Sequence, residues 1–162
     1  TAVQADVLQA SRDRDAVLRE VAIMRNRIAA AKGGGGVWEV KLGQGRLQDI
    51  ELVAQAAAVI AGQPLGTVPG ALARGAECGW LTPEDADALS DAYRLCWALQ
   101  IGSRLISEST LAPDQDSSAA SEFLCRITGT SSIEGLQDQL EARTKRAADV
   151  INGVLPDVKE EE

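Results

Sequence analysis

Residues 37–55, VWEVKLGQGRLQDIELVAQ, decide the fold of this chain. An apolar, β-branched opening leads into a Gly-x-Gly turn at Gly43 and Gly45, and the turn leads into a helical pattern that continues to Ala61. This helix is apolar nearly all round, which is typical of the central helix of a bundle. Its first turns nevertheless carry two carboxylates, Asp49 and Glu51.

The two carboxylates point to different sides of the predicted helix. At about 100° per residue they lie about 160° apart, with Glu51 on a narrow polar stripe and Asp49 among apolar residues. Free backbone N–H groups and the positive end of the helix dipole favour a carboxylate in the first turn. In a structural interpretation, Asp49 therefore holds its own helix start, and Glu51 pairs with Arg46 or with an arginine of another helix.

The alternative interpretation makes this turn a binding platform. Lys41, Gly43, Gly45 and Arg46 bring bare backbone and positive charge to a helix N-terminus, where a phosphate or an acidic loop could dock. The turn lacks the Lys-Ser/Thr of a P-loop and the full glycine set of a dinucleotide fold, so the sequence supports neither of those mechanisms.

The remaining sequence predicts an all-α fold: a helical bundle of five to six helices with one short extended segment near 37–42. Residues 1–156 form the predicted bundle domain, residues 108–118 a polar, mobile loop, and residues 157–162 a disordered acidic tail. Besides the helix that ends at residue 61, the predicted helices cover residues 4–32, 68–79, 82–107, 119–129 and 131–156.

Several helix boundaries have chemical signals. Gly62 suits a C-terminal cap, Thr82 suits an N-terminal cap before Pro83, and Ser131-x-x-Glu134 has the spacing of a capping box. Aromatic residues near these boundaries and within the helices are expected to anchor the core: Trp80, Tyr93 and Trp97.

Composition excludes several classes of function. The 162-residue chain has a formal net charge of −8 and no histidine, so it has no basic surface for nucleic acid and no Ser-His-Asp, Cys-His or His-ligated metal site. Cys78, Cys96 and Cys125 lie in apolar surroundings, which indicates small buried side chains in a reducing, cytoplasmic compartment. No segment suits a signal peptide or a membrane span, and the start at Thr1 without methionine predicts a piece of a longer protein.

Acidic pairs with Asp-x-Asp spacing occur three times, at residues 13 and 15, 85 and 87, and 114 and 116. Two-metal nucleotidyl transfer requires such a pair on a strand. All three pairs fall in predicted helices or in the polar loop, so we expect them to be solvated and expect no metal ligands in this chain.

The stretch at 38–55 resembles the signature of bacterial glutamate–ammonia ligase adenylyltransferases, in which Lys, a glycine turn and Asp-Ile-Glu precede a buried helix. The preceding VAIMRNRIAAAK resembles the connecting helix of that family. GALARGAECGWLTPEDADALSDAYRLCWALQIGSRL and EFLCRITGTSSIEGLQDQLEARTKRAADVINGVLP resemble its later helices, so the resemblance covers almost the whole chain.

The resemblance implies a role in nitrogen assimilation. One half of these two-headed enzymes transfers AMP from ATP to a tyrosine of glutamine synthetase, and the other half removes it by phosphorolysis. The signal protein PII and glutamine regulate both activities, and ATP and Mg²⁺ serve the enzyme. The chain is similar to the helical region of the C-terminal, AMP-attaching half, so the implied partner is glutamine synthetase, with PII and glutamine as further partners.

The family's catalytic motif is absent. A Gly-Ser motif and an Asp-x-Asp pair on strands bind two magnesium ions in that family, and nothing in this sequence matches them. We therefore expect no catalytic residue and no cofactor in the chain by itself, only in the parent enzyme. Arg46 also replaces a usual glycine, and Leu52 stands where Phe is frequent, which adds a cation beside Asp49 and Glu51.

These residues suggest a hinge between catalytic core and bundle. Lys41, Gly43, Gly45, Arg46, Asp49 and Glu51 would connect loop to helix and face the nucleotide cleft, and charge reversal at Asp49 would cost more activity than stability. Two alternatives remain: a non-enzymatic protein-interaction bundle, and the equivalent region of a PII uridylyltransferase, which shares the Asp-Ile-Glu turn.

Overall fold

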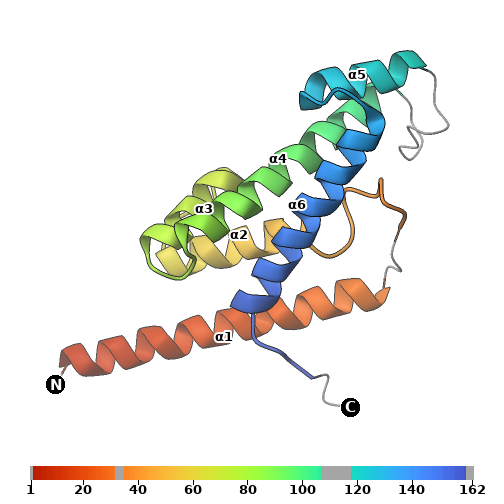
Figure 1. The fold of residues 1–162 in the computed structure, drawn as a ribbon. Helices are drawn as coiled ribbons and strands as arrows, with labels where there is room; N and C mark the ends of the chain where they lie inside the picture. The colour runs from red at the N-terminus through yellow and green to blue at the C-terminus, as the bar shows by residue number, and fades with distance from the viewer. Residues whose placement is uncertain (1, 32–34, 107–117, 160–162) are drawn as a thin grey trace.

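The structure, a computed structural model, describes residues 2–31, 35–106 and 118–159, with side chains described from residue 13 onward except that of residue 118. Within these ranges every regular element is a helix, which confirms the predicted all-α fold (Figure 1). The helices are α1 (Ala2–Ala31), α2 (Leu47–Ala61), α3 (Val68–Glu77), α4 (Pro83–Ile106), α5 (Ser118–Thr128) and α6 (Ile133–Val154).

Helix α2 is the central element, as its apolar circumference predicts. It contacts α1, α3, α4 and α6, and Ile50, Val53 and Ala54 are fully buried. Fully burying an isoleucine or valine side chain stabilises the fold by about 1.5–3 kcal/mol. Because α2 has neighbours on several sides, any polar group in it needs a partner inside the bundle.

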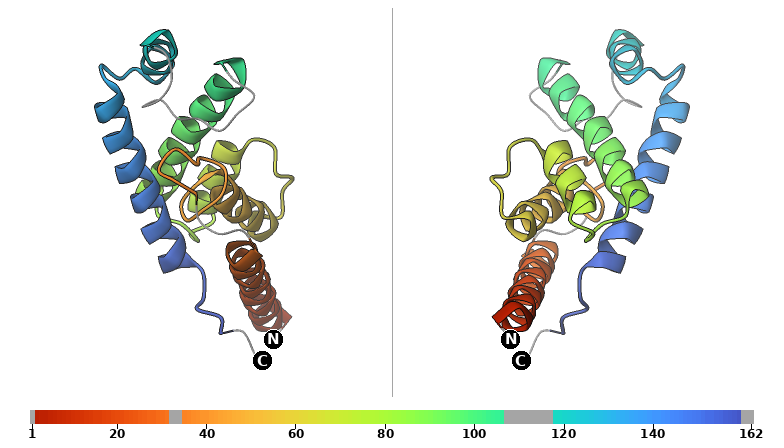
Figure 2. Two further views of the ribbon diagram at one scale, coloured as in Figure 1. Left: turned by 90° about the vertical axis from the view of Figure 1, so that its right-hand side faces the viewer. Right: turned by 90° about the vertical axis from the view of Figure 1, so that its left-hand side faces the viewer.

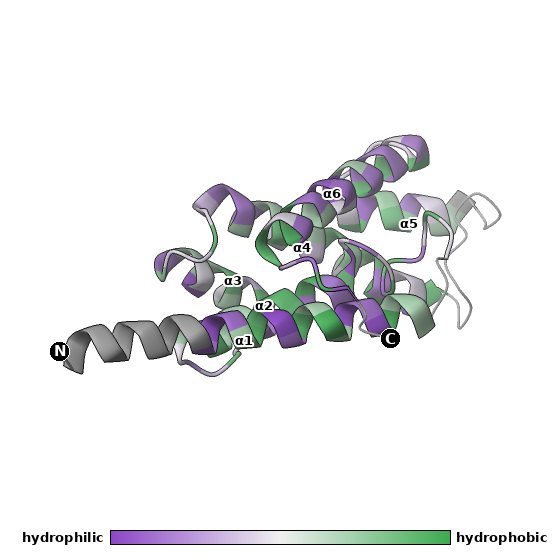
Figure 3. Cartoon of the chain, turned by 90° about the horizontal axis from the view of Figure 1, so that it is seen from below, coloured by the Kyte–Doolittle hydropathy of each residue, from purple (hydrophilic) through white to green (hydrophobic). Residues whose placement is uncertain are grey.

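The long helices α4 and α6 run in opposite directions and pack on each other, with α5 across their upper ends (Figures 1 and 2). Helix α1 crosses below α2 and the end of α6, and its N-terminal half extends past the rest of the bundle. Viewed from below, residues 13–31 of α1 alternate between hydrophilic and hydrophobic side chains (Figure 3). Helix α1 is therefore attached mainly through its C-terminal half.

Two hydrophobic clusters make up the core. The larger cluster joins α1, α2, α3, the first half of α4 and the end of α6 around residues such as Ile50 and Leu72. The smaller one joins Trp38 and Val40 to the second half of α4, to α5 and to the start of α6. Tyr93 packs against both clusters, so α4 links the two halves of the molecule.

Most predicted caps are present. Gly62 ends α2 in the left-handed conformation with φ 65°, and the Thr82 hydroxyl accepts a hydrogen bond from the Asp85 N–H before Pro83 begins α4. The capping box at Ser131 and Glu134 is wrong by one residue. Ser132 is the N-cap of α6, and its hydroxyl accepts from the Gly135 N–H at 3.0 Å.

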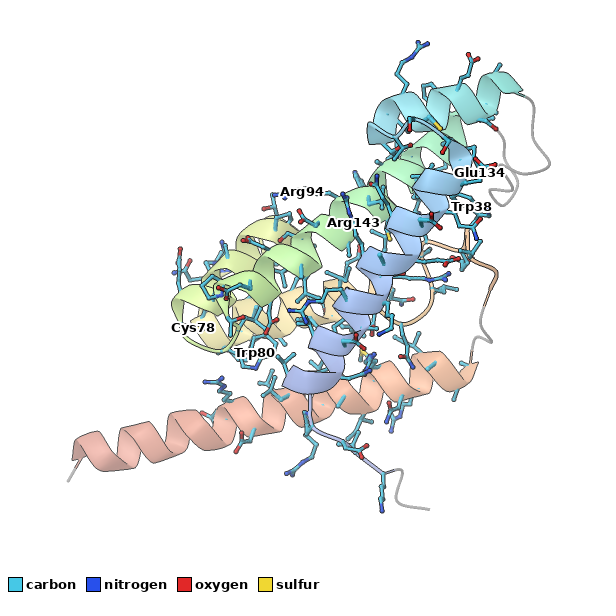
Figure 4. All side chains as sticks on the ribbon, in the orientation of Figure 1. Trp38, Cys78, Trp80, Arg94, Glu134 and Arg143 are labelled. Atoms are coloured by element: carbon cyan, nitrogen blue, oxygen red, sulfur yellow. The ribbon has the colours of Figure 1, made fainter. Side chains whose placement is uncertain are left out.

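Two predictions of burial are also wrong, and a third holds only in part because Cys125 is of intermediate exposure. Cys78 is exposed because it caps α3 just before the turn at Gly79, where the chain faces solvent, whereas Cys96 is buried as expected. Trp97 is 47% exposed because α4 turns its Leu95 and Leu99 side inward, while Trp80 is buried. Figure 4 places Cys78 and Trp80 together near the connection from α3 to α4.

The segment at 37–42 forms no strand. Buried and more exposed side chains nevertheless alternate in this segment, because Trp38 and Val40 are buried while Lys41 is exposed. The predicted loop at 108–118 lies outside the described residues apart from the first residue of α5, and so do residues 160–162 of the predicted tail. Val158 of that tail packs against the larger core cluster.

No helix in the described part of the chain has the length and apolar character needed to span a membrane.

Candidate functional site

The candidate site is built around the carboxylate of Asp49. This side chain is only 6% exposed. Its two oxygens accept a bidentate pair of hydrogen bonds from Arg25 of α1, Nε to Oδ1 at 2.6 Å and Nη2 to Oδ2 at 3.1 Å. Paired, planar contacts of this kind are among the stronger hydrogen bonds in proteins. Asp49 is therefore held by α1, and not only by the start of its own helix.

The same carboxylate holds the glycine turn, which packs against α6. The Gly45 N–H donates to Asp49 Oδ2 at 2.8 Å. Gly45 has φ +68°, and a Cβ there would lie 2.0 Å from the Thr144 carbonyl oxygen, so only glycine allows this backbone approach. Arg25 Nη1 also donates to Asn152 Oδ1 at 2.7 Å. We call Arg25, Gly45, Asp49 and Asn152 the Arg25–Asp49 junction.

Three backbone donors at the start of α2 are already engaged. The N–H groups of Arg46, Leu47 and Gln48 donate to the carbonyls of Gly43, Val40 and Lys41 at 3.3, 3.1 and 3.0 Å. A phosphate at this helix N-terminus would have to displace these bonds. The arrangement thus favours the structural interpretation of the turn over the phosphate platform.

Arg46 pairs with neither Asp49 nor Glu51, whereas the structural interpretation offered it as a partner of Glu51. Its Nη1 donates to the carbonyls of Gly36, at 3.1 Å, and of Glu39. Gly43 lies against the same side chain, since a Cβ there would be 3.2 Å from Arg46 Cδ. The Lys41 side chain is exposed, and the Lys41 backbone N–H donates a hydrogen bond to Glu39 Oε1 at 2.9 Å. Arg46 and Glu39 therefore brace the loop from within.

Glu51 lies apart from the junction, on the α4 side of α2. Its side chain forms no hydrogen bond or ion pair among the described residues, but it acts electrostatically on Tyr93. Burial, and next the Glu51 carboxylate, raise the pKa of Tyr93 above its ordinary value of 10.0. The structure thus joins Gly45 with Asp49 and Gly43 with Arg46, and separates Glu51 from both groups.

Sequence reasoning missed Arg25 and Asn152. A signal for Arg25 was present, because it lies four residues after Val21 and three before Ile28, on the apolar side of α1. A charge in that position requires a buried partner. Asn152 gives no comparable signal, because it lies near the end of an ordinary amphipathic helix.

A cavity of about 250 Å³ adjoins the junction between α1 and the glycine turn. Its polar walls include the side chains of Asn26, Gln44 and Gln48. Gln48 Oε1 is buried and has no hydrogen-bond partner among the described residues. Amide side chains both donate and accept hydrogen bonds.

Across the described residues, no three Cys, Asp or Glu side chains gather as a metal site.

Fold and site together define a class of protein: an all-α domain in which a buried aspartate and a largely buried arginine connect the first helix, a glycine turn and the last helix. The family model described as GlnD PII-uridylyltransferase matches residues 22–158. The chain belongs to this family.

Its relatives include enzymes named bifunctional glutamine synthetase adenylyltransferase/adenylyl-removing enzyme. The one from Rhodopseudomonas palustris (strain BisB5) is 31% identical over 92% of this chain and 15% of its own length. The one from Rhizobium meliloti is 25% identical over 95% and 16%, and that from Xanthobacter autotrophicus 34% identical over 74% and 13%. The chain therefore spans about 15% of the length of the first of these relatives, and the resemblance to adenylyltransferases is confirmed.

Proposed function

We propose that this chain is the helical domain of an enzyme that attaches AMP to glutamine synthetase and removes it. The observation that carries the proposal is the match to the Rhodopseudomonas enzyme, whose name states both activities, over 92% of this chain. In this proposal, ATP and Mg²⁺ are bound by a catalytic core outside the chain. PII and glutamine regulate the enzyme, which works in the cytoplasm.

The chain itself supplies no catalytic group in this proposal. The Asp-x-Asp pairs at 13 and 15 and at 85 and 87 lie on α1 and α4. Residues two apart on a helix point about 160° away from each other, so neither pair can converge on two metal ions as a strand pair does. The third pair, at 114 and 116, lies outside the described residues.

The role of the domain is to support the core through the Arg25–Asp49 junction. The junction fixes the glycine turn to α1 and α6 through short hydrogen bonds, and it leaves Lys41 exposed beside the turn. A loop that is held at several points presents its surface with little loss of conformational entropy. Residues 41–51 would then form the hinge that faces the nucleotide cleft.

The test is a transfer assay with the parent protein encoded by the gene. We expect the parent to transfer labelled AMP from ATP to glutamine synthetase, and we expect this chain alone to transfer none. Transfer of UMP to PII instead would overturn the proposal in favour of the uridylyltransferase alternative. If the parent transferred neither nucleotide, a non-enzymatic interaction bundle would replace it.

A further inference from the structure

The second half of α4 exposes large apolar side chains on three successive turns. Trp97, Ile101 and Leu105 are 47%, 39% and 73% exposed. Residues four apart lie on the same side of a helix, so these three form one ridge about 12 Å long. Single exposed apolar residues are ordinary, whereas a contiguous exposed group marks an interaction site.

The same ridge is positively charged. Arg94 and Arg104, both exposed, lie within about 80° of the ridge on the helical wheel. No Asp or Glu occurs between residues 94 and 105, although the whole chain has a net charge of −8. Arg94, which Figure 4 labels on α4, has its acidic neighbour Asp91 at 3.7 Å with both side chains mostly exposed, a pair that contributes little. We call Arg94, Trp97, Ile101, Arg104 and Leu105 the α4 outer face.

The α4 outer face is rigid. Leu95 and Leu99 are buried on the other side of the helix. At Gly102, a Cβ would lie 2.6 Å from Ile127 Cδ1 of α5, so α5 packs closely on α4 beside the ridge. A surface held in this way loses little conformational entropy on binding. Tryptophan and arginine are also the residues most often found at the energetic centre of interfaces.

We propose that the α4 outer face docks another part of the same parent polypeptide, one that is apolar in the middle and acidic at its edges. This inference rests on the proposed function. The chain spans 15% of the length of the Rhodopseudomonas relative, so most of such a parent lies outside the chain. A segment tethered in the same polypeptide is present at an effective concentration of the order of mM. The arginines favour acidic residues on that segment.

The test uses the full-length parent with Leu105 replaced by photo-crosslinking benzoylphenylalanine. Mass spectrometry then identifies the cross-linked peptide, with glutamine synthetase present and absent. We expect a peptide of the same polypeptide, from outside the 162-residue chain and rich in Asp or Glu. A cross-link to glutamine synthetase, a cross-link between two copies, or none at all would overturn the inference.

Charge reversal provides the second readout. Arg94→Glu with Arg104→Glu should lower the cross-link yield at least about tenfold, because like charges would then face each other. The matched control is Arg143→Glu, an exposed arginine on α6, which should leave the yield unchanged. An equal loss of cross-link yield in the double variant and in the Arg143→Glu control would overturn the inference. AMP transfer is measured separately, so an active parent without the cross-link refutes this inference alone, and an inactive parent refutes the proposed function.

Discussion

At the scale of single residues, Gly45 has the least freedom to change. It has φ +68°, and an added Cβ would lie 2.0 Å from the Thr144 carbonyl oxygen and 2.7 Å from the Ala148 nitrogen. Both atoms belong to the backbone of α6 and cannot move aside as a flexible side chain could. Gly45→Ala must therefore separate the turn from α6, which also strains the hydrogen bond from Gly45 to Asp49.

We predict that Gly45→Ala lowers the free energy of unfolding by at least about 2 kcal/mol, from left-handed backbone strain and overpacking together. Urea unfolding followed by circular dichroism measures the change. Gly36→Ala in the same loop is the control, because nothing lies within 4 Å of its Cβ position. Equal stability of the two variants would show that Gly45 does not pack closely against the backbone of α6.

The buried thiol of Cys96 gives a prediction for pH. Burial raises its pKa from 9.0 to about 12, although Arg46 acts in the opposite direction. The unfolded thiol loses its proton first, so the stability that this group contributes is complete below pH 9 and is lost as the pH rises toward 12. Cys96→Ala should flatten this alkaline loss of stability in urea titrations at increasing pH. An identical alkaline slope in the variant would contradict the assignment.

At the scale of elements, the pair of Arg25 and Asp49 connects α1 to α2. Removing one partner leaves a buried charge alone, at a cost of about 3–5 kcal/mol. Arg25→Gln and Asp49→Lys should both therefore lower stability strongly, and for Asp49→Lys this replaces the expectation that charge reversal mainly affects activity. Urea unfolding of each variant measures the cost, with the exposed Arg143→Gln as control.

The paired change Arg25→Met with Asp49→Leu separates charge from packing. Apolar residues of similar size can replace a buried ion pair with little loss, but the Gly45 N–H would lose its acceptor. We expect the double variant to recover part of the stability and to remain about 1–3 kcal/mol below the natural chain. If Arg25→Gln alone had no effect, α1 would not be held by this pair.

Helix positions were predictable because their signals are local. Gly62, Thr82 and Pro83 each mark a boundary through a conformation or a hydrogen bond within a few residues. The partner of Asp49 was not predictable in this way, since Arg25 is 24 residues away and nothing local selects it over Arg46. The exposure of Trp97 was missed for a related reason, because helical spacing shows that α4 has apolar sides but not which of them faces the bundle.

At the scale of the whole molecule, α4 passes through both core clusters, and Tyr93 packs against each of them. The Arg25–Asp49 junction lies beside the larger cluster, where α1, α2 and the end of α6 meet. The α4 outer face belongs to the half of α4 that packs with α5. In our proposals the parent enzyme contacts the bundle at two places, the turn with Lys41 and the α4 outer face.

Lys41 tests the first of these surfaces without disturbing the fold. Its side chain is exposed, so Lys41→Ala should change the free energy of unfolding by less than about 0.5 kcal/mol. If the turn faces the nucleotide cleft, the parent carrying Lys41→Ala should transfer AMP to glutamine synthetase about fivefold more slowly, the value of a single charge contact of about 1 kcal/mol. Lys159→Ala, an exposed lysine beyond α6, should leave the rate unchanged. A normal rate with Lys41→Ala would place the cleft elsewhere and leave the turn as an internal brace of the bundle.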